Sequence, residues 1–339
     1  MPVLPATENL PWLSVYLCFA EPWETFLVQA VKPFVEHAMN EQWARQFFFI
    51  RYWERGPHLR LRFKGNAQTL EGTLKPALLR HFGDYFIQHP SRRHDPDWTS
   101  ALPAEYQWFP NNSCQFVPYQ PELERYGGPA GILLAEQQFD TSSRAVLGLL
   151  SENAHWDYNR AMGAAVQLHL GFAHALKMDR TETAGFFDRV FQGWSSQVYQ
   201  PIAEVLPEAE RSRRHQAVMR VFENSFQQQK PVLMPLFSTV WEALEAGQEF
   251  EQEWFNGWLR GLRLIDQQLH QAQATGALDA LAWGLPTEAD PGAANQQIRW
   301  LLFDSYLHMT NNRLGIQNRE EGYLGFLLKE GFREMTLVS

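Results

Sequence analysis

The hydrophobic pattern is clearest at residues 47–63. An apolar run at 47–53 is rich in residues that favour β-strands, and turn-forming residues follow at 54–57. At 58–63 apolar and polar residues alternate strictly. Successive side chains of a strand point to opposite faces, so the apolar residues of this alternation face a core. The residues on the other face are His58, Arg60 and Arg62. The pattern predicts a β-hairpin with a basic outer face.

Periodicity predicts further elements on both sides of this hairpin. Before it lie an expected strand at 12–19 and helix at 21–39, and after it a helix at 67–89 and a short strand at 113–119. Later spacing is helical, and the expected helices are 130–138, 141–151, 156–178, 181–191, 208–227, 231–246, 249–273, 294–314 and 319–333. This order predicts an α+β fold, with a mostly antiparallel sheet and packed helices followed by a large helical portion. We expect a sheet-rich part, 1–128, carrying the arginine strand and a helical part, 129–339, within one compact domain or as two lobes.

Composition narrows the possible ligands. The chain has a formal net charge of −9, so general attraction to nucleic acid is not expected. A local basic face in an acidic protein favours a small anionic group instead. The two cysteines are far apart and predict neither a disulfide framework nor a zinc site. We find no signal peptide and no apolar run long enough to span a bilayer, so the expected location is the cytoplasm.

Two interpretations of the basic face remain open. Arginine stays protonated in proteins, so neighbouring guanidinium groups repel each other unless an anion lies between them. A carboxylate or phosphate held by forked hydrogen bonds would satisfy them. Alternatively, this face is simply exposed to solvent.

A second stretch, 119–129, combines charges with two glycines. Glu122 and Arg125 are three residues apart and could share one side of a helical turn. Gly127 and Gly128 permit backbone conformations that other residues avoid and let a ligand approach the main chain. The alternative is a surface turn with an ion pair.

A third stretch lies in the helix expected at 294–314. Asp304 is one helical turn before His308, and a carboxylate at that spacing can fix the tautomer of an imidazole. A structural histidine near an ordinary helix end is the alternative, because Asn312 and Gly315 follow.

Together the three stretches resemble the C-terminal domain of class I lantibiotic dehydratases, which also occurs free-standing as the thiopeptide-type bacteriocin biosynthesis protein. The matching strings are FFFIRYW…GPHLRLRF, PELERYGG and HMTNNRLG, in the same order and spacing. The resemblance covers essentially the whole chain. The N-terminal glutamylating region of the full-length enzymes has no counterpart in this resemblance. We therefore expect the split form, in which elimination and glutamylation are carried out by separate proteins.

The resemblance implies a lyase that removes glutamate from glutamylated Ser or Thr of a ribosomal precursor peptide, giving dehydroalanine or dehydrobutyrine. A separate partner protein would first attach the glutamate from glutamyl-tRNA. The family's elimination residues are matched by His308, Arg62, Arg60, Arg125 and Glu122. We also expect Arg51, His58, Tyr126 and Asn312 to contact substrate. No metal or organic cofactor is expected, and neither is direct binding of nucleic acid.

Two other functions fit the same sequence. Some free-standing relatives are pyridine synthases, which join two dehydroalanines in a formal [4+2] cycloaddition and expel the leader peptide. The presence of all five elimination residues favours elimination over this reaction. A non-catalytic peptide-binding subunit is the third possibility, and the complete Arg and His set argues against it.

Overall fold

The computed structural model describes residues 10–153, 155–203, 207–279, 283 and 291–338. Two compact units make up the chain, 1–156 and 157–339, and each is described by itself. The predicted helical part begins at residue 128, but its first helix, 128–151, belongs to the first unit and packs with the sheet. As a domain boundary, residue 128 stays a prediction.

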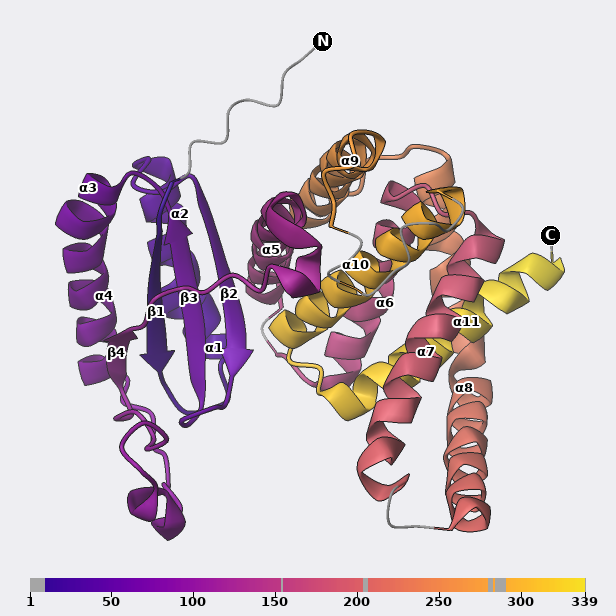
Figure 1. Cartoon of the computed structure of the whole chain (residues 1–339), viewed down its shortest axis with the longest axis horizontal. Helices are drawn as coiled ribbons and strands as arrows, with labels where there is room; N and C mark the ends of the chain where they lie inside the picture. The colour runs from indigo at the N-terminus through magenta and orange to yellow at the C-terminus, as the bar shows by residue number, and fades with distance from the viewer. Residues whose placement is uncertain (1–9, 154, 204–206, 280–282, 284–290, 339) are drawn as a thin grey trace. The chain divides into compact units, whose positions relative to one another are not determined.

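The first unit is built on a four-stranded antiparallel sheet (Figure 1). Its strands are β1 (Trp12–Cys18), β2 (Gln46–Tyr52), β3 (His58–Lys64) and β4 (Ser113–Phe116), in the order β2-β3-β1-β4. β2 and β3 form the predicted hairpin, with Phe49 opposite Leu61 and Phe48 opposite Arg62. The alternation of β3 is confirmed, because Leu61 and its apolar neighbours on one face are fully buried. The α+β class is confirmed as well.

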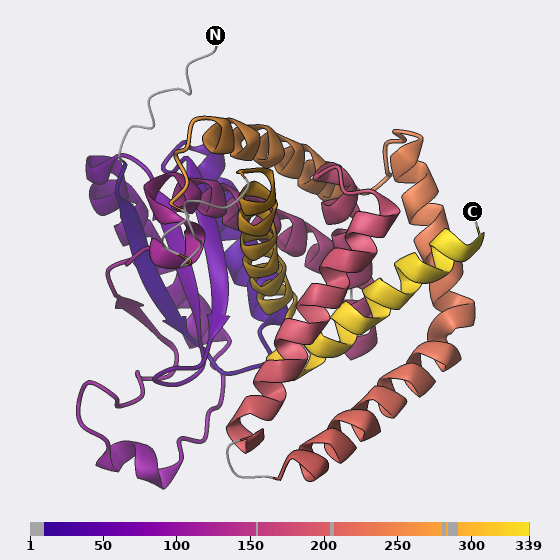
Figure 2. The same ribbon diagram turned by 45° about the vertical axis from the view of Figure 1, so that its right-hand side comes forward.

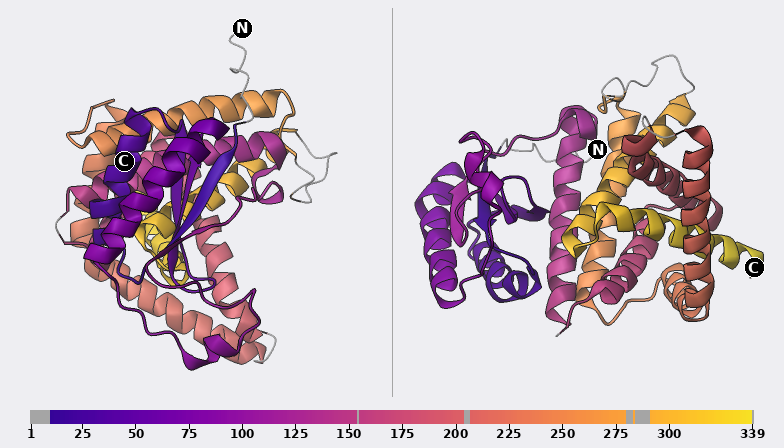
Figure 3. Two further views of the ribbon diagram at one scale, coloured as in Figure 1. Left: turned by 90° about the vertical axis from the view of Figure 1, so that its left-hand side faces the viewer. Right: turned by 90° about the horizontal axis from the view of Figure 1, so that it is seen from below.

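Helices cover the apolar face of this sheet. One continuous helix comprises α1 (Glu24–Phe26), the wider π-turns of η1 (Leu27–Val31) and α2 (Lys32–Asn40), and another comprises α3 (Ala67–Thr69), η2 (Leu70–Leu74) and α4 (Lys75–Gln88). Phe34 lies 5.9 Å from Phe63 of β3 and 5.4 Å from Phe82 of α4, measured between ring centroids. The left view of Figure 3 shows the second helix across this face. Aromatic packing thus leaves the opposite, arginine-bearing face for other contacts.

A long helix protects one edge of the sheet. α5 (Gly128–Ser151) follows two short 3₁₀ turns, η3 (Asp97–Ala101) and η4 (Glu124–Tyr126). The backbone N–H of Phe47 donates to Asp140 of α5 at 3.1 Å, and that of Phe49 donates to Ser143 at 3.2 Å. These contacts satisfy donors that an edge strand would otherwise leave without partners.

Only helices, and no strands, make up the regular secondary structure in the described part of the second unit. It contains α6 (Tyr158–Ala175), α7 (Arg180–Ala203), α8 (Glu208–Glu245), α9 (Glu253–Ala274), α10 (Pro291–Leu314) and α11 (Asn318–Val338). Figure 2 shows α7 and α11 packed along one another. None of the described helices of the chain combines the length and apolar character needed to cross a bilayer.

Three predicted helix breaks are wrong. The break expected at Gly193 does not occur, because the helix expected at 181–191 continues as α7 to Ala203. The helices expected at 130–138 and 141–151 form the single helix α5, and those expected at 208–227 and 231–246 form α8. Pro231 and Pro235 lie inside α8, where each removes one backbone donor. The helix continues past them because side chains on both sides of the prolines are buried, Phe226 before them and Phe237 after them, and hold both halves against the unit.

Candidate functional site

The buried His58 and the half-buried Arg60 form a pair on the polar face of β3. His58 has no exposed surface and stacks on Tyr16, with 4.5 Å between ring centroids. Its Nδ1 lies 2.8 Å from the carbonyl oxygen of Gly56, and its Nε2 accepts a hydrogen bond from Arg60 Nε at 3.3 Å. Burial, together with the nearby arginine charges, lowers the pKa of His58 to about 4. His58 is therefore neutral at pH 7 and donates from Nδ1 to Gly56, which leaves Nε2 to position Arg60.

Aromatic rings flank the guanidinium of Arg60. Its Cζ lies 3.4 Å from the ring centroid of Tyr52 and 4.7 Å from that of Tyr16. The exposed carboxylate of Glu54 accepts a further bond at 3.3 Å. Such stacking fixes the plane of a guanidinium while its remaining N–H groups stay available.

Arg62 is the more unusual of the two arginines. It is only 7% exposed, and its Cζ lies 4.4 Å from the ring centroid of Tyr119 and 5.1 Å from that of Phe48. Its Nε is buried without a hydrogen-bond partner, and no carboxylate among the described residues lies within 4.0 Å. Burial lowers its pKa, but an arginine still keeps its proton at neutral pH. The site thus holds a buried cation with no close counter-ion in the part of the chain that is described.

The turn carrying Glu122 and Arg125 belongs to the same neighbourhood. The carboxylate of Glu122 lies 3.5 Å from Arg125 and also acts electrostatically on Arg62. Both turn residues are exposed, whereas Tyr126 is buried against Phe139 of α5 with 5.4 Å between centroids. Gly127, with φ of 73°, and Gly128, with φ of 84°, adopt the left-handed conformations predicted for this turn.

Arg51 lies on the opposite face of the sheet. It is 3% exposed and forms an ion pair with Glu24 of α1 at 2.5 Å. The structure therefore does not place it with Arg60 and Arg62, and its contact with substrate stays a prediction.

In the second unit, His308 lies on α10 with a carboxylate partner from the next helix. Both carboxylate oxygens of Glu321 on α11 are 3.1 Å from His308 Nδ1. Burial raises the pKa of Glu321, and the charge of Asp304 raises it further, whereas bonds from His308 and Asn311 lower it. The imidazole also lies against Trp194, 5.1 Å between centroids, and its side chain is 20% exposed. The partner that fixes the imidazole is Glu321, where the sequence had suggested Asp304.

The structure thus brings the predicted residues together in two groups. His58, Arg60, Arg62, Glu122 and Arg125 gather in the first unit. His308 and the half-buried Asn312, one turn later on α10, belong to the second. Sequence reasoning missed Tyr16, Tyr119 and Glu321. Tyr16 could have been found from the predicted strand at 12–19, because it lies opposite Arg60 when that strand pairs with β3. No sequence spacing connects Glu321 with His308.

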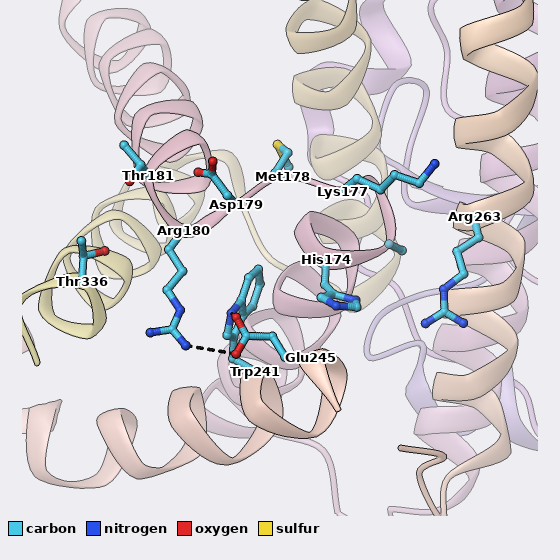
Figure 4. Close-up of a pocket in the computed structure, with 11 residues that line it drawn as sticks. His174, Lys177, Met178, Asp179, Arg180, Thr181, Trp241, Glu245, Arg263 and Thr336 are labelled. Atoms are coloured by element: carbon cyan, nitrogen blue, oxygen red, sulfur yellow. Dashed lines mark hydrogen bonds and ion pairs between the residues drawn. The ribbon is translucent and has the colours of Figure 1, made fainter. Parts of the chain in front are cut away.

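Each unit also contains a cavity. One of about 730 Å³ in the first unit is lined by Tyr119 and by Trp12, Lys64, Pro118 and Pro121. One of about 940 Å³ in the second is lined by His174, Trp241, Arg263 and the ion pair of Arg180 with Glu245 (Figure 4). Only the first adjoins a predicted site residue, because Tyr119 also stacks on Arg62. The described residues contain no cluster of three or more His, Cys, Asp or Glu side chains that could hold a metal ion.

Comparison with known proteins gives the family. Residues 12–331 match the family model described as lantibiotic biosynthesis dehydratase C-term. The chain belongs to this family. Subtilin biosynthesis protein SpaB of Bacillus subtilis is 29% identical over 135 residues, which make up 40% of this chain and 11% of SpaB.

Solved structures share the fold. The pyridine synthase TbtD from thiomuracin biosynthesis superposes with a TM-score of 0.70 at 18% identity, covering 97% of this chain and all of TbtD (100%). The tRNA-dependent lantibiotic dehydratase MibB from Microbispora sp. 107891 gives a TM-score of 0.59 at 20% identity, covering 99% of this chain and 29% of MibB. The chain therefore spans only a small part of SpaB and MibB but the full length of TbtD.

Proposed function

We propose that this protein catalyses glutamate elimination from glutamylated Ser or Thr of a ribosomal precursor peptide. The observation that carries the proposal is Arg62, a buried guanidinium without a close counter-ion among the described residues. A buried charge is costly unless it is paired, so a site that retains one is suited to an anionic substrate. A glutamyl group with its carboxylates, and the enolate oxygen formed during elimination, supply that negative charge.

Each residue has a role in this reaction. A base removes the Cα proton of the modified residue, the Cβ–O bond breaks, and glutamate leaves as a carboxylate. We assign the proton transfers to His308, whose Nε2 is the free end of a ring held at Nδ1 by Glu321. Arg62 stabilises the enolate oxygen, while Arg60 and Arg125 hold the glutamyl carboxylates and Glu122 orients Arg125.

The substrate would come from two partners. A precursor peptide supplies the Ser and Thr residues, and a separate glutamyl-tRNA-dependent protein attaches the glutamate. The cavity beside Tyr119, rich in proline and aromatic side chains, would receive peptide flanking the modified residue. We expect the reaction to take place in the cytoplasm, where glutamyl-tRNA is available.

The test supplies purified protein with a glutamylated precursor peptide and follows its mass. Wild type should release glutamate and leave dehydrated residues, whereas Arg62→Ala and His308→Ala should leave the glutamylated peptide unconverted. Arg92→Ala, which removes an exposed arginine of the same unit, should behave as wild type. Equal dehydration by wild type and both site variants would refute the proposal.

The full-length match to TbtD favours pyridine synthesis as a second candidate. A peptide that already carries two dehydroalanines and its leader separates the two activities. Ring formation with release of the leader would identify a pyridine synthase. Binding of the precursor without either conversion would identify a peptide-binding subunit.

A further inference from the structure

Within the second unit, a line of buried polar side chains starts at the partner of His308. Behind Glu321 lies Asn311 of α10, and behind Asn311 lies His169 of α6. These three side chains are 3%, 4% and 1% exposed. His169 Nε2 is 2.8 Å from Asn311 Oδ1. Asn311 in turn acts on the carboxylate of Glu321, whose pKa it lowers. Buried polar groups in such a connected chain fix one another's orientation.

The protonation of His169 sets the direction of these bonds. Burial lowers its pKa to about 4, so the imidazole is neutral at pH 7 and carries one proton. Its Nδ1 is buried without a hydrogen-bond partner, and a bare lone pair is cheaper to bury there than an unpaired N–H. The proton is therefore on Nε2, which donates to Asn311 Oδ1. This bond turns the amide N–H₂ of Asn311 towards Glu321.

Among the described residues, the titratable groups that act on Glu321 are His308 and Asp304. A carboxylate held by Asn311 presents both oxygens to His308 Nδ1, each at 3.1 Å. If the amide rotated, its oxygen would face the carboxylate, and repulsion would disturb that geometry.

We propose that His169 and Asn311 are positioning residues, which hold the Glu321 carboxylate so that His308 keeps its proton on Nδ1 and presents Nε2 as the base. This role rests on the elimination reaction proposed above. Neither residue touches substrate. Both act through Glu321.

Two measurements on the full chain test this inference. The first is ¹⁵N NMR of labelled histidines, in which the shifts of His308 report its tautomer without any substrate. The second is the pH profile of elimination with a glutamylated peptide. The variants are His169→Leu, Asn311→Leu and His169→Gln, whose amide retains a donor. His174→Leu is the control, because His174 lies on the same helix but packs against Trp241, outside this line.

Both Leu variants should convert His308 to a mixture of tautomers and reduce turnover about tenfold, as loss of an orienting partner commonly does. Asn311 lowers the pKa of Glu321, so its loss should also move the acidic limb of the profile to higher pH. His169→Gln and His174→Leu should keep the single tautomer and the wild-type profile.

Unchanged His308 tautomers in folded Leu variants would overturn the inference. A folded His169→Gln variant as defective as His169→Leu would also overturn it, and this result decides the matter if the Leu variants unfold. If wild type releases no glutamate, the proposed function fails, and the NMR measurement still decides whether the line of residues holds His308.

Discussion

His58 lies beside the arginines of β3 and is uncharged at neutral pH. It lies between the Arg60 guanidinium and the Gly56 carbonyl, stacked on Tyr16, and a protonated imidazole there would meet Arg60 and Arg62 without a counter-charge. The neutral ring can accept from Arg60, which a charged one cannot. The electrostatics of the arginine face therefore depend on keeping this histidine deprotonated.

This arrangement makes the protein acid-sensitive. In the unfolded chain a histidine titrates near pH 6.5, whereas His58 has a pKa of about 4 when folded. Between these values the unfolded state binds more protons, so stability falls as pH drops through that window, by up to about 3 kcal/mol from this group. Urea unfolding of wild type between pH 7 and pH 4 measures the loss. In His58→Phe the loss should be smaller, whereas His94→Asn, at an exposed histidine, should leave it unchanged.

Two buried arginines of one sheet should respond oppositely to the same substitution. Arg62 has no close carboxylate among the described residues, whereas Arg51 is paired with Glu24 at 2.5 Å. Replacing a buried unpaired cation by Met removes a desolvation cost, so Arg62→Met should raise the free energy of unfolding by about 1 kcal/mol. Arg51→Met leaves Glu24 without its partner and should lower it by about 3 kcal/mol.

Urea unfolding of both variants measures whether each substitution raises or lowers the free energy of unfolding. The elimination assay then measures whether Arg62→Met still releases glutamate. A stabilised Arg62→Met protein that no longer eliminates glutamate would show an arginine kept for function at a cost in stability. Destabilisation of Arg62→Met comparable to that of Arg51→Met would instead make Arg62 a structural residue.

Among the elements, the strands were the most predictable. Alternation at 58–63 fixes which face of β3 is apolar, and hence that Arg60 and Arg62 share a face, because the strand period allows no other arrangement. The extent of α8 was not predictable, because whether a helix continues through Pro231 depends on packing that local sequence does not encode. The contact of Glu321 with His308 was not predictable for a similar reason, because it depends on how α10 and α11 pack together.

The contact between α5 and the edge strand offers a prediction at this scale. Ser143→Ala removes the acceptor of the buried Phe49 N–H and should lower the free energy of unfolding by about 2 kcal/mol. Ser142→Ala is the matched control, because the hydroxyl of Ser142 donates to carbonyls of its own helix, those of Gln138 and Phe139. Helical N–H groups already serve such carbonyls, so the loss of this hydroxyl should have a much smaller effect. Equal losses of stability in urea would contradict an edge-protecting role for α5.

At the scale of the whole molecule, the sequence predicted a locally basic strand within an acidic chain. A net charge of −9 coexists with a strand that carries two arginines and a histidine, and the structure buries Arg62 and His58 rather than exposing them to solvent. Sequence patterns could not show that burial, because Tyr16 and Tyr119 reach the arginines through strand pairing and a distant loop. The solvent-exposed interpretation of this face is thereby ruled out for these two side chains.

The proposed reaction draws on residues from both units, and this can be tested without reference to their arrangement. If Arg62 and His308 serve one elimination step, each single Ala variant should lose most of the rate, and the double variant should be little worse than the poorer single one. Independent contributions would instead multiply, since their effects on the activation free energy would add. Single-turnover release of glutamate from a glutamylated peptide measures all three variants. Multiplied losses would mean that Arg62 and His308 contribute independently, and the proposal that they act as one coupled unit would have to be given up.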